Sequence, residues 1–265
     1  MENRDFHFEP EDLISLIESR SLDRVPCGLE DLENLPSRFD WRDFGLVSPI
    51  KDQADCGSCW AFATVGMVES VYNVENLRAL NPDLSEQNLV SNCYPPASCF
   101  GRNASVEAGL DTLEFIKTNG IVDEDCFPYQ SGDCDVYDSD LKRVVCRDSC
   151  SCSEVSCSNP CDCNFCSDWT NRLWRILDYG MPEIHLARLD RKKALLRYGP
   201  LEVCGAGHCV VLIGWDDSVE SWIIKNSWGI DWEDLGFGYV RYRDPWRSER
   251  TWVERTYYVK GIISP

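Results

Sequence analysis

The sequence predicts an α+β fold in which a helix-rich half precedes a half built of short strands. Two observations support this prediction: apolar residues recur at helical spacing after Cys59, and short apolar runs dominate beyond about residue 170 of the 265 residues. Helices and strands in separate runs are typical of the α+β class. A chain of this length can bury a substantial core, as one large domain or as two tightly packed lobes.

Three helices are expected between residues 35 and about 120. The first begins directly after Cys59, the second at Ser85 and the third at Ser105. The third has the clearest signals, because Ser105 is a suitable N-cap, acidic residues follow it and Gly120 provides a stop.

Antiparallel strands are expected in the second half, where apolar runs of four to six residues are bounded by Gly, Asp or Pro. The runs are Leu201–Val203, Val210–Ile213, Trp222–Lys225, Gly238–Tyr242 and Tyr257–Val259.

A cysteine-rich segment at about residues 134–168 lies between the two halves. Eight cysteines fall between Cys134 and Cys166, and hydrophobic side chains are almost absent from 149 to 164. Burial cannot order such a segment, so disulfides or a metal ion would have to do so. The thiolates available to a tetrahedral zinc ion would be those of Cys150, Cys152, Cys161, Cys163 and Cys166. The absence of His and of regular finger spacing favours disulfides, and both alternatives stay open.

Composition narrows the range of partners. The net charge of −19 argues against nucleic acid or an anionic membrane surface as a partner. No run of about 18 apolar residues exists to cross a membrane, and no apolar signal segment follows Met1. Sixteen cysteines nevertheless suit an oxidising compartment, so an extracellular or lumenal location is expected.

The segment Cys56-Gly-Ser-Cys-Trp60 is the most informative part of the chain. A cysteine at the start of a helix faces unpaired backbone N–H groups and the positive end of the helix dipole, and both favour thiolate over thiol. Cys59 is therefore the candidate nucleophile. Its alternative role, as a buried structural thiol or half of a disulfide, is disfavoured by this context.

Acyl transfer also requires a proton acceptor, a group that orients it and a donor for the developing oxyanion. His208 lies 149 residues after Cys59 and Asn226 lies 167 residues after it. Gln53 lies just upstream. We therefore expect His208 to be the base, Asn226 to hold its ring, and Gln53 to donate an N–H to the oxyanion.

These segments together resemble papain-like cysteine peptidases, whose signature is C-G-[SA]-C-[WY] with His and Asn about 130–150 residues downstream. The matching segments follow the family order. They are Leu35–Arg42 at the start of the mature enzyme, the expected strand Val47–Gln53, Leu84–Val90, Phe127–Tyr129, Gly207–Trp215 and Lys225–Gly229.

The resemblance implies a two-lobed molecule with a helical N-terminal lobe and a β-barrel-like C-terminal lobe. Cys59 would lie on the first lobe and His208 on the second, with the active site in the cleft between them. The implied activity is a cysteine endopeptidase that hydrolyses peptide bonds of peptide or protein substrates through a thioester. No cofactor and no metal at the site are implied, and a monomer is expected.

The resemblance also suggests substrate-binding and accessory residues. Trp228 would shield the hydrogen bond between His208 and Asn226 from water. The residues expected to line the substrate site are Gly57, Gly101, Arg102, Cys209 and Trp228. Residues 1–34 would be a short prosegment of a zymogen or a simple tail, and residues 35–265 the catalytic domain.

Three positions depart from the family pattern. Ala54 stands where the family has Gly, and Arg102 stands where the family has a Gly that binds substrate backbone. A loop of some twenty residues, which shapes a substrate pocket in the family, is missing before His208. The pocket is therefore expected to be more open, and this deletion casts doubt on full activity.

The cysteines divide into several groups. The resemblance implies disulfides from Cys56 to Cys99 and from Cys93 to Cys134. An odd number remains once Cys59 is set aside, and Cys209 is the candidate for a free, buried thiol. The connectivity of the other ten, which include Cys27, Cys126 and Cys204, cannot be deduced from sequence.

The sequence is also compatible with a second function. The chain could be a non-catalytic binding protein that keeps the scaffold and uses its cysteine-rich insert to hold a partner. Arg102 and the missing loop favour this alternative, whereas the presence of Cys59, His208, Asn226 and Gln53 favours the peptidase.

Overall fold

A computed structural model describes residues 35–91, 94, 106–131, 136–138, 143–145, 165–182, 188–242 and 255–265. The helices are α2 (Cys59–Glu75), α3 (Gln87–Val90), α4 (Val106–Thr118) and α5 (Arg188–Tyr198). The strands are β1 (Arg38–Asp40), β2 (Val136–Asp138), β3 (Arg143–Val145), β4 (Arg175–Gly180), β5 (Leu201–Gly205), β6 (His208–Asp216), β7 (Ser221–Lys225), β8 (Phe237–Arg241) and β9 (Arg255–Ile263). The expected prosegment 1–34, Gly101, Arg102 and most of the cysteine-rich insert lie outside the described residues.

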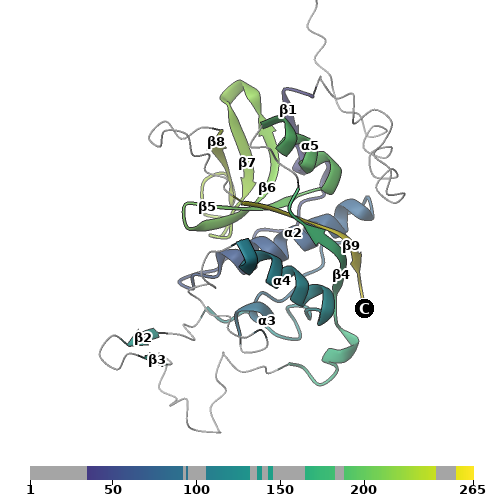
Figure 1. The fold of residues 1–265 in the computed structure, drawn as a ribbon, viewed down its shortest axis with the longest axis vertical. Coiled ribbons are helices and arrows are strands. Elements are labelled where there is room, and N and C mark those ends of the chain that lie inside the picture. The colour runs from purple at the N-terminus through teal and green to yellow at the C-terminus, as the bar shows by residue number, and fades with distance from the viewer. Residues whose placement is uncertain are drawn as a thin grey trace, which may run out of the picture.

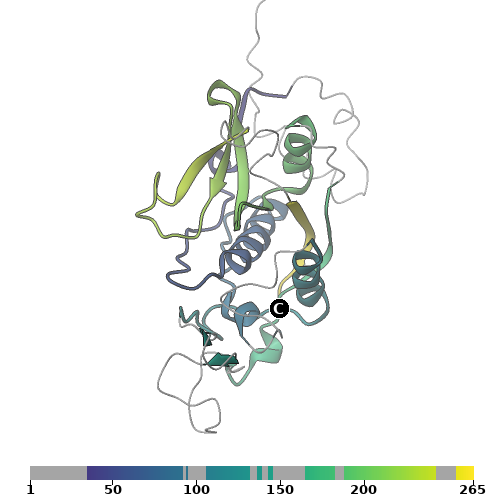
Figure 2. The same cartoon turned by 60° about the vertical axis from the view of Figure 1, so that its left-hand side comes forward.

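One antiparallel sheet organises the chain, and its strands run in the order β4-β9-β5-β6-β7-β8, with β1 paired to β6. Helix α2 lies beneath strands β5 to β7, α3 lies farther from these strands, and α4 packs against β4 and β9 (Figure 1). The same layering is visible from the side in Figure 2, where α2 separates the strands from α3. The strands β2 and β3 form a separate hairpin. The expected α+β architecture is therefore confirmed.

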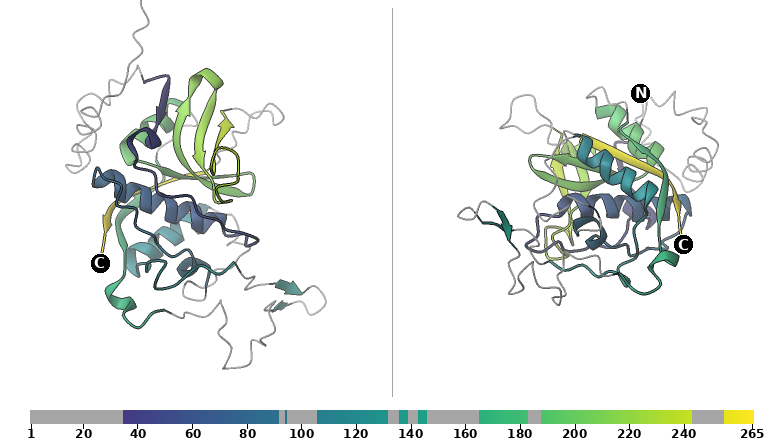
Figure 3. Two further views of the ribbon diagram at one scale, coloured as in Figure 1. Left: turned by 180° about the vertical axis from the view of Figure 1, so that it is seen from behind. Right: turned by 60° about the horizontal axis from the view of Figure 1, so that its bottom comes forward.

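Helix α2 is buried almost all round, as expected for a helix enclosed by other elements. It contacts β5, β6 and β9. At its C-terminal end, the Glu75 carboxylate accepts hydrogen bonds from the backbone N–H groups of Gly261 and Ile262 in β9, at 2.6 and 2.9 Å. Strand β9 also runs alongside α4, as the right-hand view of Figure 3 shows. Strand β9 thus connects the sheet to the helical part of the molecule.

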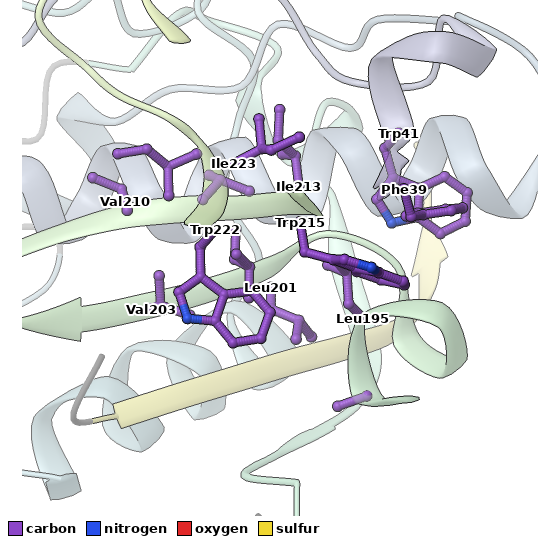
Figure 4. Packing of buried hydrophobic residues seen from close by; sticks show 14 of the residues in the cluster. Phe39, Trp41, Leu195, Leu201, Val203, Val210, Ile213, Trp215, Trp222 and Ile223 are labelled. Atoms are coloured by element: carbon purple, nitrogen blue, oxygen red, sulfur yellow. The ribbon is translucent and has the colours of Figure 1, made fainter. Parts of the chain in front are cut away.

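The N-terminal segment completes the core of the sheet. Strand β1 pairs with β6, and this brings Phe39 against Trp215 with ring centroids 5.1 Å apart (Figure 4). Trp41 and Trp215 are fully buried beside Leu195 of α5. A second core forms around α2, α4 and β9. The first described segment therefore packs with the strand-rich half of the molecule, although it precedes the helices in the sequence.

Most elements agree with the sequence expectations. Helix α2 begins at Cys59, and α4 ends at Thr118, two residues before Gly120, which has a φ of +83° as a helix stop requires. All five expected strands are present as β5 to β9. The second helix is only the four residues of α3.

Several features differ from the expectations. Residues 47–53 do not form a strand, because only Asp52 makes a bridge, to Trp228. The strands β1 to β4 and the helix α5 were not expected. Helix α5 has few apolar residues and so a weak periodic signal, yet it buries Leu195 and Leu196 against the sheet. Within the described residues, no helix combines the length and apolarity needed to cross a membrane.

Candidate active site

Cys59 is the first residue of α2 and is a free, buried thiol, 9% exposed. This is the helix N-terminus that the sequence predicts. Burial raises the pKa of the Cys59 thiol, and hydrogen bonds from the backbone N–H groups of Cys209 and Trp60 oppose that shift. Cys209 directly follows His208. The sulfur at the start of α2 therefore lies next to the start of β6, where the expected base is placed.

His208 is the first residue of β6 and lies 2.8 Å from Asn226, measured from Nε2 to Oδ1. The backbone N–H of Ser227 donates to the same Asn226 Oδ1 at 2.9 Å, which identifies that atom as the acceptor oxygen. His208 Nε2–H must then be the donor in its bond to Asn226. This tautomer leaves Nδ1 as the ring nitrogen that can take a proton.

The indole of Trp228 stacks on the His208 ring, with centroids 4.7 Å apart and planes 29° apart. Asn226 is 3% exposed, whereas Trp228 is 47% exposed. One face of the His208 ring is therefore covered by an aromatic side chain.

The pKa shifts of the two groups have the same cause. Burial lowers the pKa of His208, and the hydrogen bond with Asn226 offsets this only in part. Burial separately disfavours a charged Cys59 and a charged His208. A thiolate and an imidazolium formed together would stabilise each other, because opposite charges in a poorly solvated place interact strongly. Charge separation at this site thus depends on the two side chains acting as a pair.

Gln53 is 6% exposed and its side chain is held at both ends. Its Nε2 donates to the backbone oxygen of Cys56 at 2.8 Å, and its Oε1 accepts from Ser227 Oγ at 2.6 Å. One Nε2 hydrogen remains for another acceptor. Sequence reasoning missed Ser227, which contacts both Gln53 and Asn226. Its position within the motif Lys225–Gly229 could have marked it as a site residue.

Buried polar contacts anchor the segment that carries Gln53. Lys51 Nζ lies 2.9 Å from Glu69 of α2 and 3.0 Å from Glu86. Burial would lower the pKa of Lys51, but the carboxylates of Glu69 and Glu86 raise it overall. Tyr129 Oη also donates to the Gln53 carbonyl oxygen at 2.9 Å. The position of Gln53 is therefore coupled to the helical core.

Ala54 adopts a left-handed backbone conformation, with a φ of +48°. This is the position where the resemblance expects Gly. The conformation costs an L-residue roughly 1–2 kcal/mol, and a Gly would adopt it freely at a smaller entropic cost.

Replacing Ala54 with Gly should therefore stabilise the fold by about 0.5–1 kcal/mol, since strain at this turn is relieved. Replacing it with Val should destabilise, because a β-branched side chain tolerates this region poorly. Urea unfolding of the two variants beside the parent protein measures both effects. Equal stability of the Gly and Val variants would contradict the argument.

A tight hairpin joins β5 and β6 at the place where the resemblance expects a longer loop before His208. Ala206 and Gly207 are its two turn residues, and both have positive φ, at +51° and +84°, as a type I′ turn requires. Cys204 and Cys209 lie opposite each other next to this turn and form a disulfide. The expectation that Cys209 is a free thiol is therefore wrong. Cys204 lies directly opposite Cys209 on the neighbouring strand, and the local sequence pattern did not predict this pairing.

The structure describes only some of the other residues expected to bind substrate or to form disulfides. Gly57 is exposed beside the start of α2. Cys56 is disulfide-bonded, and its expected partner Cys99 lies outside the described residues, as do Cys93 and Cys134. Gly101 and Arg102 lie outside them too.

A second disulfide joins Cys126 to Cys166. The sequence left the partners of both residues open. Cys166 was one of the five thiolates considered for zinc, and in the structure its sulfur is taken by Cys126. The other four cysteines of that set lie outside the described residues.

Glu202 is a buried acid beside the Cys204–Cys209 disulfide, 2% exposed. Thr64 Oγ1 of α2 donates to its carboxyl at 2.7 Å. Burial raises the pKa of Glu202 to about 8, with the Thr64 bond acting in the opposite direction. The carboxyl therefore keeps its proton at neutral pH. A disulfide sulfur has no hydrogen, so the 3.6 Å contact with Cys204 Sγ is an O–H···S bond that Glu202 donates.

This proton should make stability depend on pH. The folded pKa of Glu202 lies near 8, above the ordinary 4.5, so its contribution is complete below pH 4.5 and is lost as pH rises through 8. Relative to Glu202→Gln, the parent protein should lose up to about 1.4 kcal/mol per pH unit in that interval. Urea unfolding at several pH values measures the difference. The exposed change Glu220→Gln is the control and should run parallel to the parent; a parallel Glu202→Gln curve would contradict the prediction.

The chain has an α+β fold, a buried cysteine at the start of a helix, and a hydrogen-bonded His–Asn pair whose histidine precedes Cys209, the residue whose backbone acts on that cysteine. This combination is the one that the cysteine-protease class requires. The chain belongs to the papain family of cysteine proteases, whose family model matches residues 35–249. It is 34% identical over 226 residues to a viral cathepsin of Heliothis zea nuclear polyhedrosis virus, covering 82% of this chain and 55% of that protein. It is 32% identical over 214 residues to thiol protease aleurain of Arabidopsis thaliana, covering 77% and 55%. The chain thus spans about half the length of these relatives.

Solved structures show the same fold. The bromelain protease from Ananas comosus, in complex with the E64 inhibitor, matches with a TM-score of 0.58 and 24% identity, covering 85% of this chain and 99% of that one. A structure from a study of the mite allergens Blo t 1 and Der p 1 also matches with a TM-score of 0.58 and 24% identity, covering 85% and 71%.

Proposed function

We propose that this chain is a cysteine endopeptidase that hydrolyses peptide bonds of peptide or protein substrates. The observation that carries the proposal is the tautomer of His208. Its Nε2–H is committed to Asn226, so Nδ1 is free to share a proton with a sulfur that contacts the next residue's backbone. Family membership supports the same activity.

In the first step, the Cys59 thiolate attacks the carbonyl carbon of the scissile bond. The carbonyl oxygen becomes an oxyanion, which the remaining Gln53 Nε2–H and the backbone N–H of Cys59 stabilise. The His208 imidazolium then gives its Nδ1 proton to the leaving amine, and the C–N bond breaks. A thioester on Cys59 remains.

The second step releases the acid product. His208 Nδ1 takes a proton from water, which attacks the thioester carbonyl, and the Cys59 thiolate leaves. Asn226 keeps the imidazole ring plane fixed through both steps, and Trp228 keeps water from that hydrogen bond. This cycle regenerates the starting pair and needs no cofactor.

The test is labelling by E64, the inhibitor named for the bromelain structure. The protein is trimmed to begin at Leu35 and incubated with E64 under mildly reducing conditions, and the adduct is mapped by peptide mass spectrometry. We expect one adduct, on Cys59, and hydrolysis of a peptide substrate that stops when the adduct forms. A folded protein that neither labels nor hydrolyses would favour the non-catalytic binding protein instead.

We further infer an extracellular or lumenal location and a monomeric state. Two disulfides, Cys126–Cys166 and Cys204–Cys209, support an oxidising compartment. Residues 1–34 are proposed to act as a prosegment, and comparison of activity before and after trimming tests this. Light scattering of the trimmed protein tests the monomer.

A further inference from the structure

The turn that carries His208 has little packing of its own. Ala206 and Gly207 are exposed, and a Cβ placed on Gly207 would meet no atom within 4 Å. His208 is the first residue after this turn. Its ring is held at Nε2 by Asn226, but the backbone that carries the ring depends on the end of the β5–β6 hairpin.

The Cys204–Cys209 disulfide closes that end. It joins opposite residues of β5 and β6, one step from the pair formed by Gly205 and His208. The backbone N–H of Cys209 also lowers the pKa of Cys59, which requires that it lie close to the Cys59 sulfur. One residue of the disulfide thus contacts the candidate nucleophile and directly follows the candidate base.

The other residue of the disulfide is tied to the helix that carries Cys59. Glu202 donates to Cys204 Sγ and accepts from Thr64, five residues after Cys59 in α2. These contacts form a continuous connection from α2 through Glu202 and the disulfide to His208. The helix with the sulfur and the hairpin with the imidazole are thereby fixed to each other.

We propose that the Cys204–Cys209 disulfide is a positioning element for His208, so that hydrolysis requires Cys59 reduced and this disulfide oxidised at the same time. The proposal rests on the proposed peptidase function. The disulfide would restrain the β5–β6 turn, whose two residues are exposed and are not held by side-chain packing.

A dithiol reductant should affect the activity in two opposite ways. A dithiol reductant that frees an oxidised Cys59 also attacks Cys204–Cys209. It transfers two electrons and two protons, which leaves two protein thiols and converts the dithiol to its own disulfide. Activity should therefore rise and then fall as the dithiol concentration increases, and reoxidation should restore it.

The first experiment compares the double variant Cys204→Ala/Cys209→Ala with Cys126→Ala/Cys166→Ala, which removes the other described disulfide. We expect the first to lower kcat by on the order of 10- to 100-fold with little change in KM, since misplaced catalytic groups cost about this much. The pH dependence of Cys59 alkylation by iodoacetamide should also shift to higher pH, because a displaced His208 no longer stabilises the Cys59 thiolate. The Cys126/Cys166 variant should lose stability but keep the parent alkylation profile.

The second experiment uses the parent protein and does not depend on how a variant folds. Activity and the alkylated fraction of Cys204 and Cys209 are followed together during a dithiol titration, in the parent and in Cys126→Ala/Cys166→Ala. The fall in activity should follow the reduction of Cys204 and Cys209 in both. No falling limb, or a parent-like alkylation profile in Cys204→Ala/Cys209→Ala, would overturn the proposal. Absence of E64 labelling in the disulfide-bonded parent would instead refute the peptidase function itself.

Discussion

Replacing Cys59 with Ala should reduce peptide hydrolysis to the background rate. The proposed chemistry forms its covalent intermediate on this sulfur, and removal of a triad nucleophile typically costs on the order of 10⁶ in kcat. Steady-state hydrolysis of a fluorogenic peptide by the trimmed protein measures the loss. The fold should be retained, because Ala favours a helix and fits the space of a buried thiol.

His208→Ala is the matched comparison for this prediction. It should also abolish turnover, yet leave Cys59 open to alkylation at high pH, since the thiol then ionises without a partner. Cys59→Ala has no such thiol. Turnover above one per cent of the parent rate, in a folded Cys59→Ala preparation free of parent enzyme, would show that another nucleophile acts.

Replacing Gln53 with Ala should lower kcat by roughly 10²–10³, with slow turnover still measurable. The side chain is fixed by Cys56 and Ser227, so its remaining N–H is preorganised for an oxyanion. The loss is smaller than for Cys59 because the backbone N–H of Cys59 remains as a donor. Single-turnover acylation rates, measured beside steady-state kcat, assign the loss to the acylation step.

Ser227→Ala gives an internal control for the Gln53 prediction. It leaves the donor in place but removes the 2.6 Å bond that holds its Oε1, so we expect a loss on the order of tenfold. The same change in a Gln53→Ala background should add little, because the two residues act together. Equal losses for Gln53→Ala and Cys59→Ala would contradict the separate roles of donor and nucleophile.

Local patterns were sufficient for much of this molecule. The helix at Cys59, the stop at Gly120 and strands β5 to β9 follow from periodicity and turn residues that lie next to each other in the chain. The candidate site residues Cys59, His208 and Asn226 were also identified by the motifs that surround them. Their spacing along the chain supported the same assignment, although each motif is also recognisable by itself.

Weak or long-range signals account for what the sequence missed. Helix α5 is highly charged, and its helicity becomes evident only when Leu195 and Leu196 are seen buried against the sheet. Strand β1 joins a sheet whose other strands begin far along the chain, at residue 175. The local periodicity of these two segments does not indicate that α5 packs on the sheet or that β1 pairs with β6.

The sequence by itself therefore determined the α+β class, the papain resemblance and the identity of the candidate nucleophile, base and orienting amide. Only the tertiary structure decided that Cys204 pairs with Cys209, that Ser227 connects Gln53 to Asn226, and that a two-residue turn replaces the missing loop. The physical reason is that residue type and spacing encode local conformation and chemistry, whereas cross-strand register and buried contacts are set by the whole packed chain.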